Sequence, residues 1–305
     1  MIRFGQLSSR GLDPRLYQIA SLSGLLLYGL LALDFEVGLA RAATILATAL
    51  CTQYAFGRIR KLPAYEPKSA LISGLSLCLL LRTNSLATAA ATAVVAVASK
   101  FVVRWDGKHV FNPTNIGLVS MMLIVAPVWV SPGQWGNAAF FAFLMACIGG
   151  LVVNRAARSD VTVAFIGSYA ALLLARSVWL GQPLTNPLQG LQNGAFLLFS
   201  FFMISDPRTT PSSRVGRLVF AMLVAAGALF VQFVLYRTNG LLWSLALFSM
   251  AVPLIDRLLP GRASSGDPSL PASLPWKGVT HATPLAPVVA LEPGGPARDV
   301  ARGRA

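Results

Sequence analysis

The stretch at residues 107–117, GKHVFNPTNIG, is polar and separates two long apolar runs. A proline disfavours helix at the residue before it and fits the first turn of a helix after it, so Asn112-Pro113 predicts a helix that begins at Pro113. The first N–H groups of such a helix are free to bind an anion or a carbonyl, and Asn112 and Asn115 add amide donors and acceptors. The stretch therefore predicts a polar site inside the fold, although an ordinary turn explains the same spacing.

The composition predicts a membrane protein. Of the 305 residues 55% are hydrophobic and 12% are charged, which is more apolar than a soluble domain needs. A helix that crosses a bilayer takes about 20 residues. Apolar runs of about that length lie near residues 16–33, 38–57, 86–103, 114–130, 137–153, 161–179, 218–236 and 239–255.

Two further apolar runs are only half as long. They are SALISGLSLCLLL at 69–81 and AFLLFSFFMI at 195–204, and each ends at a polar cluster, Arg82-Thr83-Asn84 or Ser205-Asp206-Pro207. We count both as spanning elements, which brings the total to ten. Each is third in its half of the chain, and paired interrupted helices in corresponding positions are typical of inverted repeats around a central site. Short ordinary helices with polar ends are the alternative.

The distribution of Lys and Arg predicts the topology. With the N-terminus in the cytoplasm, 21 of the 25 basic residues fall on the cytoplasmic side of ten spans, as the positive-inside rule requires. The net charge of +14 then reflects topology and attraction to anionic lipid, and nucleic acid is not expected as a partner. We expect a multi-pass protein of a bacterial-type inner membrane with both termini in the cytoplasm.

The predicted fold class is therefore an all-α integral membrane protein of about ten helices in two inverted five-helix repeats, with the third and eighth helices interrupted. Residues 1–15 form a cytoplasmic N-terminus that lacks the features of a cleaved signal peptide. The repeats occupy residues 16–130 and 131–258. Residues 259–305 hold many of the 19 prolines among Gly, Ser and Ala, which predicts a disordered cytoplasmic tail.

Four segments carry a resemblance to a known family. They are SALISGLSLCLLL, GKHVFNPTNIGLVSMMLI, NGAFLLFSFFMISDPRTTP and LALFSMAVPLIDR. In this order and at similar spacing they resemble the RnfD/NqrB family over about residues 16–258. This family supplies the flavin-bearing membrane subunits of the Rnf complex and of the sodium-pumping NADH:quinone reductase. The resemblance implies an inverted-repeat fold, related to urea-channel architecture, that passes electrons across the membrane.

The resemblance also implies a non-covalent flavin, riboflavin or FMN, near the cytoplasmic side. Asn112 matches a flavin-contacting asparagine of the family, and His109 stands where relatives have another asparagine, so that contact is expected in altered form. Asn115, Asp206 and Thr210 complete the candidate site. For Asp206 the alternative role is to cap a helix that starts at Pro207 and includes Thr210.

Covalent FMN, by contrast, is not expected. Relatives attach it to a threonine of a Ser-Gly-Ala-Thr motif in the outer segment between the fifth and sixth helices, but residues 131–137 of this chain, SPGQWGN, contain no threonine. The nearest similar run, around Thr283, lies in the predicted cytoplasmic tail beside His281. We interpret it as a chance match.

The sequence offers few residues that could bind another cofactor or form an ion relay. His109 and His281 are the only histidines, too few for a bis-histidine haem inside the membrane. Cys51, Cys78 and Cys147 are scattered singly, so no disulfide or metal site is predicted, and a cluster shared between Cys78 and another subunit is the alternative to a core role. Every acidic residue is expected at a helix end, in a loop or in the tail, without a buried carboxylate relay.

Two classes of function remain. In the first, the chain is a subunit of an electron transport complex, which leaves open whether it acts as an oxidoreductase itself. It relays electrons through the bound flavin with the help of flavin-binding or cytochrome partner proteins, or serves as an accessory redox protein of a biosynthetic pathway. In the second, it is a small-solute channel or transporter of similar architecture. Fold analogy does not separate the two, because one scaffold hosts several functions.

Overall fold

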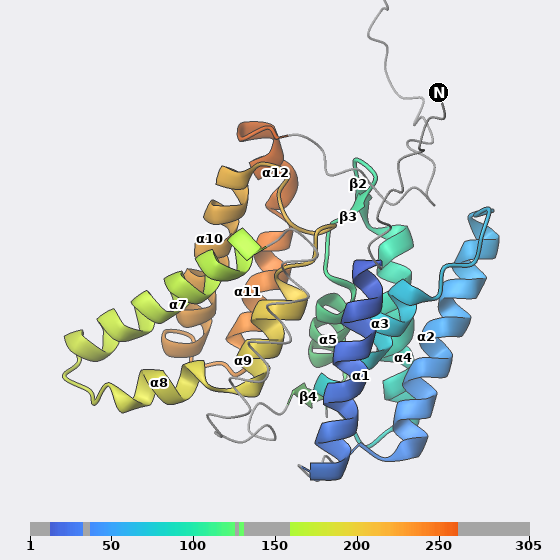
Figure 1. Cartoon of the computed structure of the whole chain (residues 1–305), viewed down its shortest axis with the longest axis horizontal. Helices are drawn as coiled ribbons and strands as arrows, with labels where there is room; N and C mark the ends of the chain where they lie inside the picture. The colour runs from blue at the N-terminus through green and yellow to red at the C-terminus, as the bar shows by residue number, and fades with distance from the viewer. Residues whose placement is uncertain (1–12, 33–36, 126–127, 131–158, 262–305) are drawn as a thin grey trace, which may run out of the picture. The chain divides into compact units, whose positions relative to one another are not determined.

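A computed structural model describes residues 13–32, 37–125, 128–130 and 159–261 of the chain. In these ranges the protein is mostly helical, and its strands are two residues long each (Figure 1). The coarse prediction of an all-α membrane protein is confirmed. The expected Pro-rich tail and the outer segment 131–137 lie outside the described residues.

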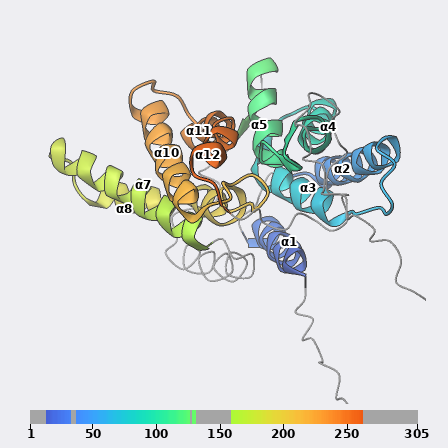
Figure 2. The ribbon, with the colours of Figure 1, turned by 90° about the horizontal axis from the view of Figure 1, so that it is seen from above.

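The first half of the chain forms a group of five helices. Helix α3 packs against α1 and α2, α4 packs against α2, and α5 packs against α4 (Figure 2). The contact between α4 and α5 is close because Gly117 lacks a side chain; a Cβ there would lie 2.8 Å from the Cβ of Ala96. The five helices are α1 (Pro14–Ala32), α2 (Leu39–Ile59), α3 (Lys68–Leu80), α4 (Leu86–Val102) and α5 (Pro113–Ile124).

The short run of the first half is the 13-residue helix α3. It ends where the polar cluster begins, and its chain continues as the strand β1 (Leu81–Arg82), which pairs antiparallel with β4 (Trp129–Val130). This pairing satisfies backbone groups that a broken helix would otherwise leave bare. Arg82, 5% exposed, turns back and donates from Nη1 to the carbonyl of Leu81 at 2.9 Å.

The strand β4 corrects one predicted span. We expected a helix over 114–130, but α5 ends at Ile124 and residues 129–130 are extended. Pro127 accounts for the early end, because a proline removes a helix hydrogen bond and restricts the residue before it.

A second pair of short strands forms a hairpin just before α5. The strand β2 (Arg104–Trp105) pairs with β3 (Lys108–His109). The two residues between them have positive φ, 45° at Asp106 and 78° at Gly107. An Asp-Gly pair in this conformation is the preferred connection of a tight hairpin. The hairpin holds His109 at a defined place instead of in an open cytoplasmic turn.

The second half contains a further group of helices. Helix α10 packs against both α7 and α11, and α8 packs against α7 (Figure 1). Helix α10 is capped by Ser213, whose Oγ accepts from Gly216 N at 3.0 Å. The elements are α7 (Ser159–Trp179), α8 (Thr185–Leu191), α9 (Gly194–Leu198), the π-helical segment η2 (Phe199–Met203), α10 (Arg214–Phe233), α11 (Gly240–Ser249) and α12 (Val252–Leu258).

The short run of the second half is α9 continued by η2, ten residues in all. Its aromatic side chains pack on α7. The ring of Phe165 lies 5.2 Å from that of Phe199 and 5.8 Å from that of Phe196, while Tyr169 lies 5.0 Å from Phe196. Such offset pairs add about 0.5–1.5 kcal/mol each to the burial of their area. The cluster anchors the short helix on its neighbour.

Only some of the described helices are both long and apolar enough to cross a membrane. Helices α7 and α10 are long and apolar enough, and α11 with α12 adds a third if this pair, bent by 51°, counts as one span. The expected span over 239–255 is therefore formed by two helices with a bend between them. Helices α3, α4, α5 and the α9–η2 pair are apolar but shorter. The count of ten spans and the inverted repeat stay predictions.

Candidate functional site

The start of α5 is a junction between the two halves of the chain. Asn112 is extended, at φ −60° and ψ 125°, and its Oδ1 accepts from Asn115 N at 3.1 Å. Its Nδ2 donates to the carbonyl of Met203, at the end of η2, at 3.3 Å. The first turn of α5 is thus capped by one atom of Asn112 while the other atom holds the interrupted helix of the second half.

Asn115 makes the second bond across this junction. The side chain is fully buried, and its Nδ2 donates to the carbonyl of Leu242 in α11 at 3.2 Å. Its Oδ1 has no hydrogen-bond partner among the described residues. A buried polar atom without a partner costs about 1–3 kcal/mol and calls for an explanation such as a ligand.

The start of α11, the helix of the second half that contacts α5, is built differently. Asn239 adopts the left-handed conformation, with φ 60° and ψ 33°, and makes no capping bond with its side chain. Its Nδ2 instead points to Met122 of α5, 3.5 Å from the sulfur. Gly240 then lies so close to α10 that a Cβ would overlap the carbonyl oxygen of Ala228. Close backbone contact here replaces the side-chain cap.

His109 lies in β3, beside the junction and 6% exposed. Burial lowers the pKa of this imidazole to about 3, with further lowering by the positive charges of Arg208, Lys100, Arg104 and Arg15. The ring is therefore neutral near pH 7 and has one donor and one acceptor nitrogen.

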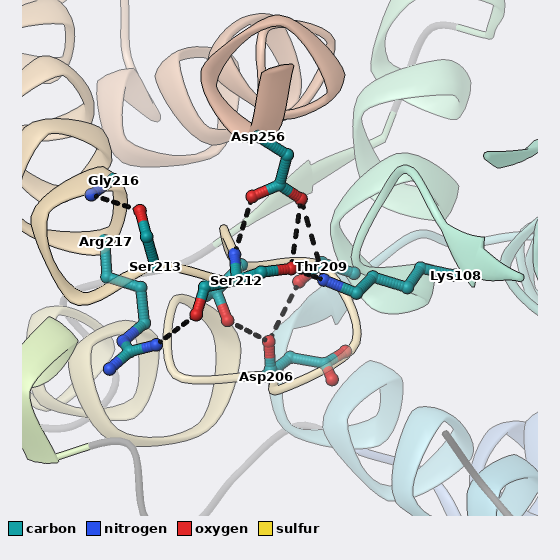
Figure 3. Close-up of polar contacts among 9 residues, drawn as sticks. Lys108, Asp206, Thr209, Ser212, Ser213, Gly216, Arg217 and Asp256 are labelled. Atoms are coloured by element: carbon teal, nitrogen blue, oxygen red, sulfur yellow. Dashed lines mark hydrogen bonds and ion pairs between the residues drawn. The ribbon is translucent and has the colours of Figure 1, made fainter. Parts of the chain in front are cut away.

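Asp206 and Thr210 lie in the loop that follows η2. The carbonyl of Asp206 accepts from the hydroxyl of Thr209 at 3.4 Å (Figure 3) and from the hydroxyl of Thr210 at 3.2 Å. The Oδ1 of Asp206 accepts from Arg208 N at 3.0 Å. The alternative role of Asp206 as a helix cap is wrong, because the helix begins only at Arg214. The carboxylate orders a turn of the loop.

A charged cluster next to this loop was missed by the sequence analysis. Lys108 of the hairpin donates to Ser212 Oγ at 2.6 Å and lies 3.6 Å from the carboxylate of Asp256 in α12 (Figure 3). Asp256 also accepts from Ser212 N at 2.6 Å. The cluster ties the hairpin of the first half to the end of the second. The quoted segments contain both Lys108 and Asp256, but nothing in their spacing pairs them.

A pocket of about 190 Å³ opens between the hairpin, the loop and α12. It is smaller than the roughly 300–1,000 Å³ of typical small-molecule sites. Its lining includes Trp105, Lys108, His109, Arg208, Ser212 and Asp256.

The predicted site residues thus fall into three places: the junction, the loop after η2 and the hairpin. Asn112 and Asn115 form the junction, and Asp206 and Thr210 share a turn of the adjoining loop. Only His109 among the five lines the pocket. Cys78, the candidate for a shared cluster, is fully buried in the hydrophobic core, and in the described ranges no three His, Cys, Asp or Glu residues gather as metal ligands do.

Comparison with known proteins gives one family. The model of the NQR2, RnfD, RnfE family matches residues 128–264. Similar curated proteins, each named as the D component of an ion-translocating oxidoreductase complex, come from Erwinia tasmaniensis, 32% identical over 127 residues, and from Vibrio atlanticus, 30% identical over 125 residues. Each match covers 40% of this chain and 34% of the relative. The matched segment thus spans about a third of the length of these relatives.

The apolar helices and the interrupted elements define a multi-pass helical membrane protein. Within that class, residues 128–264 are similar to the NQR2, RnfD, RnfE family, which confirms the predicted resemblance to RnfD and NqrB for this part of the chain. The match lies in the second half, so GKHVFNPTNIG is outside the matched residues.

Proposed function

We propose that this chain is a membrane subunit of an electron transport complex and relays electrons through a non-covalently bound flavin. The observation that carries the proposal is the match of residues 128–264 to a family whose similar members are named as components of an ion-translocating oxidoreductase complex. Redox partner proteins and a bacterial inner membrane follow from the same match. Covalent FMN is not part of the proposal, since residues 131–137 contain no threonine.

The architecture in this proposal is a pair of inverted repeats. Each half has a short apolar element, α3 or α9 with η2, and each has a later helix, α5 or α11, that follows an asparagine, Asn112 or Asn239. Helix α5 contacts α11, which supports a central site between two interrupted halves.

One atom of the junction is suited to a flavin, while its amide N–H groups are already bonded within the protein. The buried Oδ1 of Asn115 has no hydrogen-bond partner among the described residues and would suit a ring N–H, and neutral His109 can donate or accept one hydrogen bond. The amide donors of Asn112 and Asn115, however, already bind Met203 and Leu242. Asn115 is therefore the residue we assign to the flavin, with His109 beside it, while Asn112 acts by positioning Asn115 through its cap.

A bound flavin would supply the capacity to take up electrons in pairs or singly. The protein residues supply the rest. Asn115 and His109 would hydrogen-bond the ring, and the surrounding apolar helices would exclude water from it. Asp206 and Thr210 order the adjoining loop and are assigned a positioning role.

The test is the flavin content of the folded, purified protein. Protein extracted in mild detergent should be yellow and release flavin on denaturation. The variant Asn115→Leu should bind flavin at least about tenfold more weakly. This is the effect of losing one buried hydrogen bond of about 1.4 kcal/mol. Ser249→Ala is the matched control, because Ser249 Oγ is also buried without a partner among the described residues but lies at the far end of α11.

Flavin must be counted per folded molecule, since Asn115→Leu also removes the bond to Leu242. Colourless wild-type protein that is fully folded would contradict the flavin and favour the solute channel or transporter. Equal flavin content in wild type and Asn115→Leu would contradict the assigned residue alone.

A further inference from the structure

Exposed basic side chains gather at the end of the helices where the hairpin lies. They come from three separate parts of the chain, namely the end of α2, the strand β2 and the helix α12. The ion pairs of the described ranges involve other basic residues. The exposed basic residues of this surface are Arg58, Arg60, Lys61, Arg104 and Arg257.

These side chains form one surface because contacts join the elements that carry them. Arg60, directly after α2, donates from Nη2 to the carbonyl of Phe101 in α4 at 2.8 Å, and α4 leads into the hairpin. Arg60 also acts electrostatically on Arg104 of the hairpin. The guanidinium of Arg257 lies over the ring of Trp105, 5.1 Å from its centroid. We call the five basic residues together with Trp105 the Arg/Trp surface.

The positive charge of the Arg/Trp surface is not balanced by the described residues around it. Asp106, at the exposed tip of the hairpin, is one negative charge against five positive ones. Glu66, in the loop after α2, is already paired with Arg15 at 3.2 Å. Asp256 is matched by Lys108 at 3.6 Å (Figure 3). Exposed charges of one sign that lie together attract a partner of the opposite sign.

Trp105 adds an exposed aromatic ring to this charge. The residue is 45% exposed and lies in the hairpin, outside the helices. Tryptophan and arginine are enriched at the energetic centres of protein–protein interfaces, where lysine is depleted, and four of the five basic residues are arginines. Anionic lipid also attracts basic residues, but it repels a carboxylate such as that of Asp106. The composition therefore favours a protein.

We propose that the Arg/Trp surface is the docking site of a soluble partner protein with an acidic face. The inference rests on the proposed function in one respect, that the partner belongs to the same electron transport complex. The register of the hairpin supports this, because Arg104 is paired directly with His109, the residue assigned to the side of the flavin. The partner supplies Asp and Glu to the arginines and an apolar contact to Trp105.

The experiment is photo-crosslinking of the full chain in intact cells of its own host. Trp105→p-benzoylphenylalanine keeps an aromatic side chain and makes it photoreactive. The matched control is Trp179→p-benzoylphenylalanine, because Trp179 is also exposed, at 85%. It lies about 30 Å along α7 from Asp160, whose ion pair with Arg217 marks the end of α7 nearer the hairpin. An acidic protein attached at position 105 and not at 179 is the expected result.

Charge variants test the basic residues. Arg58→Glu and Arg104→Glu should each reduce the yield of the crosslinked protein at least about tenfold, because an acidic partner then meets a like charge. Arg237→Glu is the control, since it makes the same change of net charge at an exposed position outside the surface. The captured protein, once identified and purified, should bind the full chain in detergent and lose affinity as salt rises. If Arg104→Glu disturbs the hairpin, Arg58→Glu decides the result.

Attachment of lipid alone at position 105 overturns the proposal, as does the absence of any product or the capture of a protein without an acidic face. An equal effect of Arg237→Glu also overturns it, because general surface charge would then explain the capture. Failure of the flavin is a separate outcome. Colourless protein that still captures the partner contradicts the flavin alone, and yellow protein that captures none contradicts the docking site alone.

Discussion

Helices α5 and α11 contact each other and begin in opposite ways. Helix α5 starts after an extended asparagine whose side chain caps the first turn. Helix α11 starts after a left-handed asparagine without a side-chain cap, and a glycine brings its backbone against α10. The start of α5 is therefore stabilised by hydrogen bonds, and the start of α11 by close packing of its backbone. Substitutions should therefore harm them through different mechanisms.

The largest effect is expected at the steric start. Gly240→Ala places a Cβ where it overlaps the carbonyl oxygen of Ala228, and a backbone atom cannot move aside cheaply. Overpacking typically costs about 1–3 kcal/mol, and we expect the upper end in thermal unfolding in detergent. Gly167→Ala is the matched control in α7, where nothing lies within 4 Å and alanine should stabilise the helix by about 0.5–1 kcal/mol. Equal unfolding temperatures for the two variants would contradict the steric account.

A smaller loss is expected at the hydrogen-bonded start. Asn112→Ala removes the cap and the bond to Met203, for about 1 kcal/mol each. Asn112→Ser keeps a capping oxygen and should lose only about half as much. At the other start, Asn239→Gly should be neutral or stabilising, because glycine adopts positive φ without strain and Asn239 makes no cap. Unfolding measurements that rank the serine and alanine variants equally would show that the cap contributes nothing.

The third prediction concerns the pH dependence of stability. It applies to the first half of the chain, which contains His109 in the hairpin. The folded state holds the pKa of His109 at about 3, below the unfolded value near 6.5. Between these values the unfolded chain binds a proton that the folded chain does not. Stability is therefore lost as pH falls below about 6.5, with a slope approaching about 1.4 kcal/mol per pH unit.

The measurement is the free energy of unfolding in detergent from pH 7 to pH 5. His109→Gln keeps a neutral polar side chain and should flatten the slope in this range. A slope that is the same in wild type and variant would mean that His109 is not the group that titrates.

At the candidate site the sequence predicted where a helix begins. Asn112-Pro113 identified a helix start, and the structure places it at Pro113. The Asn112 side chain was assigned to a ligand, but its atoms bind Asn115 and Met203. Met203 is 91 residues away in the chain. Nothing in the sequence around this apolar residue indicates that its carbonyl accepts a hydrogen bond from Asn112.

The same limit explains why two predicted spans differ from the helices of the structure. Hydropathy over 114–130 and 239–255 is continuous, so both read as single helices. The structure ends the first at Ile124 and bends the second by 51°. The pairing of residues 129–130 with 81–82 competes with helix formation at the end of α5. Hydropathy averaged along one segment contains no information about a pairing partner in another segment.

The amino-acid sequence alone was enough to identify a helical membrane protein and to predict that one side of it is strongly basic, since composition and charge placement need no knowledge of contacts. It also determined the resemblance to RnfD and NqrB, because ordered motifs are local. Only the tertiary structure decided which groups meet: Asn112 with Met203, Asn115 with Leu242, and Lys108 with Asp256. These partners are more than 90 residues apart, and a hydrogen bond depends on distances of a few tenths of an ångström that only the packed helices set.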